Sequence, residues 1–149
     1  MRERIHAALK QATVEDDKVK LATLRLISAA IADRDIAARG AGKDPVSDEQ
    51  ILEILTKMIH QRIESIRAYE EASRIDLAEQ ERHEMAIIKS FLPEQLDDEE
   101  VRTVCADLVK ETGANGLRDI GKCMQTLKSR YRGRMDFGKA STVVKGLLS

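Results

Sequence analysis

The sequence is poor in aromatic residues, proline and cysteine, and each shortage excludes a class of protein. Phe, Tyr and Trp make up 3% of 149 residues, and there is no Trp; this argues against a stacking platform for single-stranded nucleic acid. With two prolines, eight glycines and 42% hydrophobic residues, the composition is far from that of a disordered chain. The two cysteines fit neither a CxxC pair nor a zinc-ligand spacing.

Long apolar runs are also missing, which bears on the cellular location. The start, MRERIHAALKQ, contains no run suited to a secretory signal, and no segment is apolar enough to span a membrane. The sequence therefore predicts a cytoplasmic protein with reduced thiols and no membrane partner.

The residues that are present favour an all-α fold. A core built from Leu, Ile, Val, Ala and Met, surrounded by Glu, Lys and Arg, suits helices better than sheets. Apolar periodicity predicts helices over residues 2–11, 16–39, 48–70 and 75–91. Pro93 ends the last of these, because proline lacks an amide proton and disfavours helical geometry in the residue before it. We expect an N-terminal helical hairpin or bundle domain, residues 1–94, and a small three-helix tail domain, residues 95–149.

Two local patterns mark helix starts. Ser47 with Gln50, and Asp97 with Glu100, have the spacing of a capping box. The acidic run 97–100 could suggest a magnesium site, but acids in a first helical turn are favoured by the helix dipole and need no metal. A glycine-rich turn at 113–116 separates the first two helices of the tail.

The helical phase of the second hairpin predicts an internal ion pair. Arg62 falls within the apolar stripe of the 48–70 helix, and Glu84 falls within that of the 75–91 helix. An antiparallel pairing that sets Tyr69 opposite Leu77 also sets Arg62 opposite Glu84. A lone charge at such a place is costly, so the two predict a partly buried pair that fixes the register. The alternative is that both side chains extend outward past the stripe.

No catalytic residue, metal site or cofactor site can be assembled from the sequence. His6, His60 and His83 lie far apart on separate predicted helices, so no two histidines are spaced four residues apart. Cys105 and Cys123 fall inside apolar stripes and are interpreted as small core residues. There is no phosphate-binding loop, dinucleotide fingerprint or amidase-type serine constellation.

The charge distribution points to the C-terminal part of the chain. Residues 113–149 carry eight basic and two acidic side chains, a net of +6. This favours a polyanion partner, although a solvated basic helix face is the simple alternative. Guanidinium groups suit phosphate contacts, and one tyrosine cannot stack many bases, so we expect contacts to folded RNA and none to DNA. The candidate RNA-binding residues are Arg118, Lys122, Lys128, Arg130, Arg132, Arg134 and Lys139.

Several stretches, spread over nearly the whole chain, resemble the YqeY proteins. In chain order they are TLRLISAAI from residue 23, KMIHQRIES from 57, DLAEQE from 76, FLPEQL from 91, DIGKCM from 119, KSRYRGR from 128 and VVKGLL from 143. Within that family the C-terminal part is similar to the tail of the B subunit (GatB) of the glutamine-dependent tRNA amidotransferase. The chain departs from the pattern at Cys105 and Cys123, where the family has aliphatic residues.

The resemblance implies a more specific function than the residues alone do. The amidotransferase tail is a helical appendage that contacts the body of tRNA, and the catalytic sites lie in other domains and subunits. We therefore expect a tRNA-associated protein without an active site of its own. The first alternative is an accessory subunit in glutamine-dependent tRNA amidation, a carbon–nitrogen ligase activity with glutamine as amido-N-donor, which would add amidotransferase subunits as partners. The second is a protein–protein adaptor that never meets RNA.

Overall fold

The computed structural model describes residues 1–149 and is all-α, which confirms the predicted fold class. It contains seven α-helices, one 3-10 helix and no strand. The chain divides into two compact units, Met1–Pro93 and Glu94–Ser149. The helices are α1 (Arg2–Glu15), α2 (Lys18–Gly40), α3 (Asp48–Glu71), α4 (Ile75–Lys89), α5 (Asp98–Thr112), η1 (Leu117–Asp119), α6 (Ile120–Arg130) and α7 (Phe137–Leu148).

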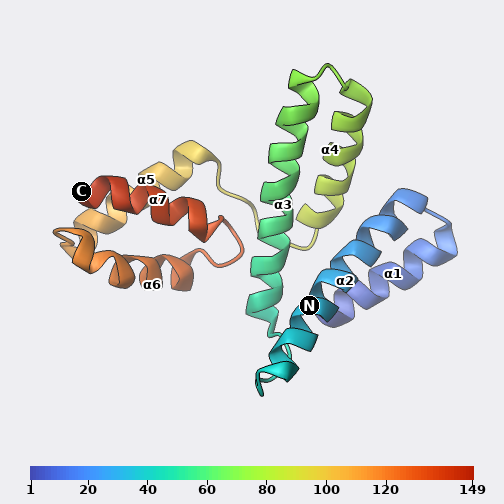
Figure 1. The fold of residues 1–149 in the computed structure, drawn as a ribbon, viewed down its shortest axis with the longest axis horizontal. Coiled ribbons are helices and arrows are strands. Elements are labelled where there is room, and N and C mark those ends of the chain that lie inside the picture. Colours follow the sequence, from blue (N-terminus) through green and yellow to red (C-terminus); the bar gives the residue numbers. More distant parts are fainter. The chain divides into compact units, whose positions relative to one another are not determined.

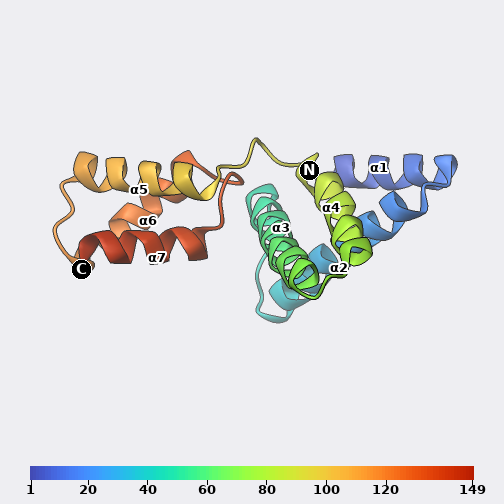
Figure 2. The ribbon, with the colours of Figure 1, turned by 90° about the horizontal axis from the view of Figure 1, so that it is seen from above.

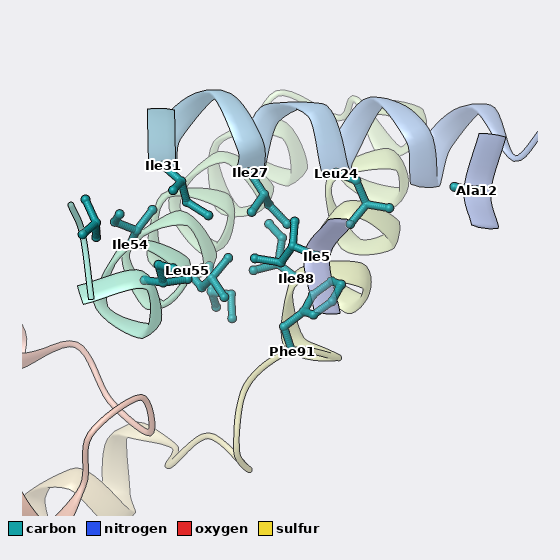
Figure 3. Packing of buried hydrophobic residues seen from close by; sticks show 12 residues of the cluster. Ile5, Ala12, Leu24, Ile27, Ile31, Ile54, Leu55, Ile88 and Phe91 are labelled. Carbon is teal, nitrogen blue, oxygen red and sulfur yellow. The ribbon is translucent and has the colours of Figure 1, made fainter. Parts of the chain in front are cut away.

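The first unit consists of two helical hairpins, α1 with α2 and α3 with α4 (Figure 1). All four helices supply aliphatic residues to one core (Figure 3). Leu24, Ile27, Leu55 and Ile88 are fully buried there. Burying an aliphatic side chain of this size contributes roughly 1.5–3 kcal/mol, so this core is the main source of stability in the unit.

The helices predicted to start at residues 2, 48 and 75 do so, whereas α2 begins at Lys18 and not at residue 16, and the end of the first helix also differs from the prediction. Both capping boxes form: the Ser47 side chain accepts from the amide of Gln50, and the Asp97 side chain accepts from that of Glu100. The predicted end of the first helix at residue 11 is wrong, because α1 continues to Glu15. Ala12 is fully buried there, and the helix stops where Asp16 adopts φ 54°.

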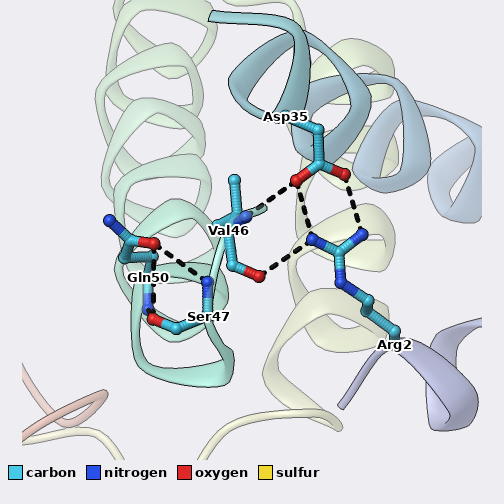
Figure 4. Close-up of polar contacts among 5 residues, drawn as sticks. All are labelled: Arg2, Asp35, Val46, Ser47 and Gln50. Carbon is cyan, nitrogen blue, oxygen red and sulfur yellow. Dashed lines mark hydrogen bonds and ion pairs between the residues drawn. The ribbon is translucent and has the colours of Figure 1, made fainter. Parts of the chain in front are cut away.

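A polar network ties the 41–47 loop to both helices of the first hairpin (Figure 4). Arg2 donates from Nη1 to Asp35 Oδ2 over 2.8 Å and from Nη2 to Asp35 Oδ1 over 2.7 Å. The same carboxylate accepts from the amide of Val46 at 2.8 Å. These hydrogen bonds from Arg2 and Val46 lower the pKa of Asp35 to about 2.

The second unit packs α5, α6 and α7 around its own core (Figure 2). Cys105, Cys123, Leu127 and Val144 are fully buried. The prediction that both cysteines are core residues is therefore confirmed, and both are free thiols. Burial raises the pKa of the Cys105 thiol, with a smaller contribution from Cys123.

Candidate nucleic-acid interface

Helix α6 is amphipathic, and its exposed side is basic. Cys123 and Leu127 face the core of the tail. The α6 outer face, defined as Gly121, Lys122, Gln125, Lys128 and Ser129, is exposed throughout. No acidic residue occurs in α6, so this face carries positive charge with no opposite charge beside it on the same helix.

Three of the candidate RNA-binding residues are exposed and unpaired. Arg118 lies in η1, directly before α6, and Lys122 and Lys128 lie on the α6 outer face. None of the three makes an ion pair or a side-chain hydrogen bond within the chain. The two lysines are six residues apart, which is about 9 Å along the axis of an α-helix. These three cations are therefore the candidates that would lose no internal partner on binding a phosphate.

Two other candidates are held by acids on α5. Arg130 donates from Nη2 to Glu111 Oε1 over 2.6 Å and from Nη1 to Glu111 Oε2 over 2.8 Å. The pair raises the pKa of Arg130 and lowers the pKa of Glu111. Lys139 Nζ lies 3.0 Å from Asp98 Oδ1. For these two residues, a phosphate would compete with an existing ion pair.

The remaining two candidates lie in the turn between α6 and α7. Arg132 is half-buried, and Arg134 donates from Nε to the carbonyl of Glu94 over 3.0 Å. The carbonyl of Arg134 accepts from the amide of Leu96 at 2.9 Å, and that of Gly133 accepts from Gln95. The turn between α6 and α7 thus holds residues 94–96, which precede α5, by hydrogen bonds.

Over the whole second unit the positive charge is almost balanced. Residues 94–149 carry ten basic and nine acidic side chains, a net of +1. The excess seen in residues 113–149 is offset by acids in 94–112, several of which lie on α5. The feature available for a polyanion is consequently a local one, the α6 outer face together with Arg118.

The structure brings Arg62 and Glu84 together, the residues for which the register of the second hairpin predicts an ion pair. Arg62 Nη2 lies 3.4 Å from Glu84 Oε2, and the side chains are 12% and 15% exposed. Arg62 Nε also lies 3.9 Å from Glu81 Oε2. Burial, and secondarily the neighbouring Glu84, raise the pKa of Glu81. These three residues lie within the α3–α4 hairpin of the first unit, whereas the α6 outer face belongs to the second.

Other chemistry-bearing residues are not clustered. His6 and His83 are exposed and His60 is half-buried, each on a different helix. No group of three His, Cys, Asp or Glu side chains is placed to hold a metal ion. None of the helices combines the length and the apolarity that crossing a membrane would require.

These features define a class: a two-unit, all-helical protein whose tail presents unpaired cations on one helix. The sequence profile of the Yqey-like protein family matches residues 2–148. The chain belongs to the Yqey-like protein family.

Similar fungal proteins share one description, "Altered inheritance of mitochondria protein 41, mitochondrial". The one from Vanderwaltozyma polyspora is 30% identical over 147 residues, covering 92% of this chain and 77% of that protein. That from Clavispora lusitaniae is 28% identical over 144 residues, covering 94% and 80%. A Saccharomyces cerevisiae relative is 33% identical over 84 residues, covering 56% and 44%.

These relatives contradict the cytoplasmic location predicted from the sequence, since they are described as mitochondrial proteins. The prediction depended on the absence of an apolar secretory run. Mitochondrial targeting segments are amphipathic and rich in arginine rather than apolar, so that argument had no bearing on mitochondria.

Proposed function

We propose that this protein binds the folded body of tRNA through Arg118 and the α6 outer face, and that it has no active site of its own. The observation that carries the proposal is the presence of three exposed cations, Arg118, Lys122 and Lys128, that have no internal partner. The similarity of the tail to that of the amidotransferase B subunit supports tRNA as the polyanion. The tail has neither a sheet nor a row of aromatic side chains, so the contacts are to phosphates and shape rather than to splayed bases.

Salt dependence of binding measures this electrostatic contribution directly. Each phosphate neutralised changes the log–log slope of affinity against salt by roughly −0.7 to −0.9, so three contacts give about −2 to −3. The experiment is a fluorescence-anisotropy titration of labelled total tRNA with the full chain at several salt concentrations.

Variants then locate the surface. Changing Arg118, Lys122 and Lys128 together to Ala should weaken binding and remove most of the slope. A matched triple variant instead changes three exposed, unpaired cations of the first unit, Lys10, Lys43 and Lys57, to Ala. Equal losses in the two triple variants, at unchanged circular dichroism, would contradict the assignment to α6.

The structure also determines which variants are unsuitable for this test. Replacing Arg130, Arg132 and Arg134 would remove the ion pair with Glu111 and the hydrogen bond from the Arg134 side chain to the carbonyl of Glu94. A loss of binding in that variant could come from unfolding of the tail. The three unpaired cations avoid this ambiguity.

A further inference from the structure

Helix α2 has an apolar face that the first unit leaves uncovered. Its residues Leu24, Ile27 and Ile31 point into the core (Figure 3). At 100° per residue, Ala29 lies almost diametrically opposite them. Between residues 22 and 36, the exposed residues within about 60° of Ala29 form what we call the α2 outer stripe: Ala22, Arg25, Leu26, Ala29, Ala32, Asp33 and Ile36.

The composition of this stripe is unlike that of a solvated helix face. It contains three alanines and two large aliphatic side chains, Leu26 at 49% and Ile36 at 69% exposure. The exposed face of α3 shows the ordinary pattern, with the polar residues Glu53, Lys57, Gln61, Glu64 and Arg67.

The two charged residues of the stripe are both unpaired. Arg25 and Asp33 are exposed, and neither makes an ion pair or a side-chain hydrogen bond within the chain. They are eight residues apart, about 12 Å along the helix, which is too far for them to meet each other. The stripe therefore carries one positive and one negative charge, and both are free to pair with groups of another molecule.

The stripe is self-complementary about its centre. Arg25 and Asp33 lie four residues on either side of Ala29, and Ala22 and Ile36 lie seven residues on either side. In an antiparallel two-fold pair of helices centred on Ala29, each residue meets the one equally far on the other side of the centre. Arg25 then meets Asp33 of the second copy, and Ile36 covers Ala22 of the second copy, each twice.

We infer that the α2 outer stripe is a homodimer contact, in which α2 of one copy packs antiparallel against α2 of a second copy. Alanine at the crossing point permits close approach, near the lower end of the usual 8–10 Å between helix axes. The charge pattern selects a second copy as the occupant, because the sequence of the stripe supplies both halves of each ion pair.

The expected dimer is weak. Stable interfaces bury about 800 Å² per partner, and a stripe of four helical turns offers less than that. Self-association should therefore depend on protein concentration, and sedimentation equilibrium of the full chain between low micromolar and millimolar concentration should show a monomer–dimer equilibrium. A monomer throughout this range overturns the proposal and leaves the stripe to a different kind of partner.

A charge-swap series tests the register. Arg25→Asp alone, or Asp33→Arg alone, brings like charges together at two places and should weaken the dimer by about tenfold or more. The double variant Arg25→Asp with Asp33→Arg restores opposite charges and should restore the affinity. A double variant as weak as the singles overturns the proposed pairing.

Two further variants distinguish a contact through the α2 outer stripe from changes in association that any surface charge substitution would cause. Ala29→Glu sets two carboxylates beside the two-fold axis and should abolish the dimer; association that persists in this variant, with its helicity intact by circular dichroism, overturns the proposal. The control is Glu53→Lys with Lys57→Glu, an equivalent swap on the exposed face of α3. A dimer that weakens as much in this control as in the single α2 variants also counts against the stripe.

Discussion

At the residue scale, the group around Arg62 shows how a charge is accommodated between two apolar stripes. Arg62 Nη2 lies 3.4 Å from Glu84 Oε2, and both side chains are mostly buried. Removing one partner of a fully buried pair costs about 3–5 kcal/mol, and an exposed pair contributes about 1 kcal/mol or less. This pair is intermediate in burial and length, so its loss should cost an intermediate amount.

We predict that Arg62→Ala and Glu84→Gln each lower the free energy of unfolding by about 1–3 kcal/mol. Urea unfolding of the two single variants and the double variant gives the coupling energy between the residues. Glu81→Gln serves as the comparison and should be close to neutral or stabilising, because burial disfavours the charged form of Glu81. Strictly additive single effects would mean that the two side chains do not interact.

Because of the hydrogen bonds to Asp35, we expect the stability of the protein to fall at low pH. The pKa of Asp35 is lowered to about 2, so over the pH range between this value and the usual value near 4 the unfolded chain binds more protons than the folded one. The contribution of this carboxylate is thus present above about pH 4 and is lost as the pH falls toward 2.

Asp35→Asn should consequently lower the melting temperature at neutral pH and flatten its fall between pH 4 and pH 2. Thermal unfolding followed by circular dichroism over that range measures both effects. Asp44→Asn, at an exposed residue of the same loop without an internal partner, removes the same charge as a control. An identical pH profile for the two variants would show that the Arg2 and Val46 contacts contribute nothing.

At the element scale, two glycines of the tail should respond in opposite directions to the same substitution. Gly121 is exposed within α6, and an added Cβ there would meet no atom within 4 Å. Gly113 ends α5 with φ 67°, in the left-handed region that glycine adopts without strain.

Gly121→Ala should therefore stabilise the tail by about 0.5–1 kcal/mol. Gly113→Ala should destabilise it by about 1 kcal/mol or more. Both changes in stability can be measured on the full chain by adding denaturant and monitoring the unfolding of residues 94–149 through hydrogen exchange of the α5 and α6 amides. A stabilising effect at both sites would show that the end of α5 tolerates other geometries.

Features encoded locally could be predicted at this scale, and contacts between distant elements could not. The capping boxes involve residues three apart, and the Arg62–Glu84 pair follows from two helical phases joined by a short turn. By contrast, Arg130 and Glu111 lie on different helices 19 residues apart. Their meeting depends on how α5 and α6 rotate about their axes, and no spacing in the sequence specifies that rotation.

The candidate site shows the same division. Charge along the chain pointed to the basic segment, but it did not show which of the basic residues are held by ion pairs within the chain. Acids of α5 fold back against the basic segment, so that Asp98 lies beside Lys139 and Glu111 beside Arg130. Of the seven candidates named from the sequence, only packing separates Arg118, Lys122 and Lys128 from the rest.

At the scale of the whole molecule, each unit has a hydrophobic core of its own. The buried residues of the first core all lie before Pro93, and those of the second all lie after it. No buried side chain of one core is needed to complete the other, and independent cores allow independent folding.

We predict that residues 1–93 and 94–149 each fold when expressed separately. Their far-ultraviolet circular dichroism spectra, summed, should reproduce the spectrum of the full chain. Because a domain of fewer than 60 residues is marginal, the tail fragment should melt first. A tail fragment that is unfolded at low temperature would show that it depends on the first unit.

The placement of the two cysteines also means that their reactivity reports on the opening of the second unit. Both thiols are fully buried, and both belong to the second core, so the first unit has none. A maleimide reaches either sulfur only when the tail opens, and the alkylation rate under native conditions therefore measures the opening equilibrium of that unit alone. A ligand that holds the tail closed would slow this labelling in proportion to its occupancy, and no cysteine would have to be introduced by mutation.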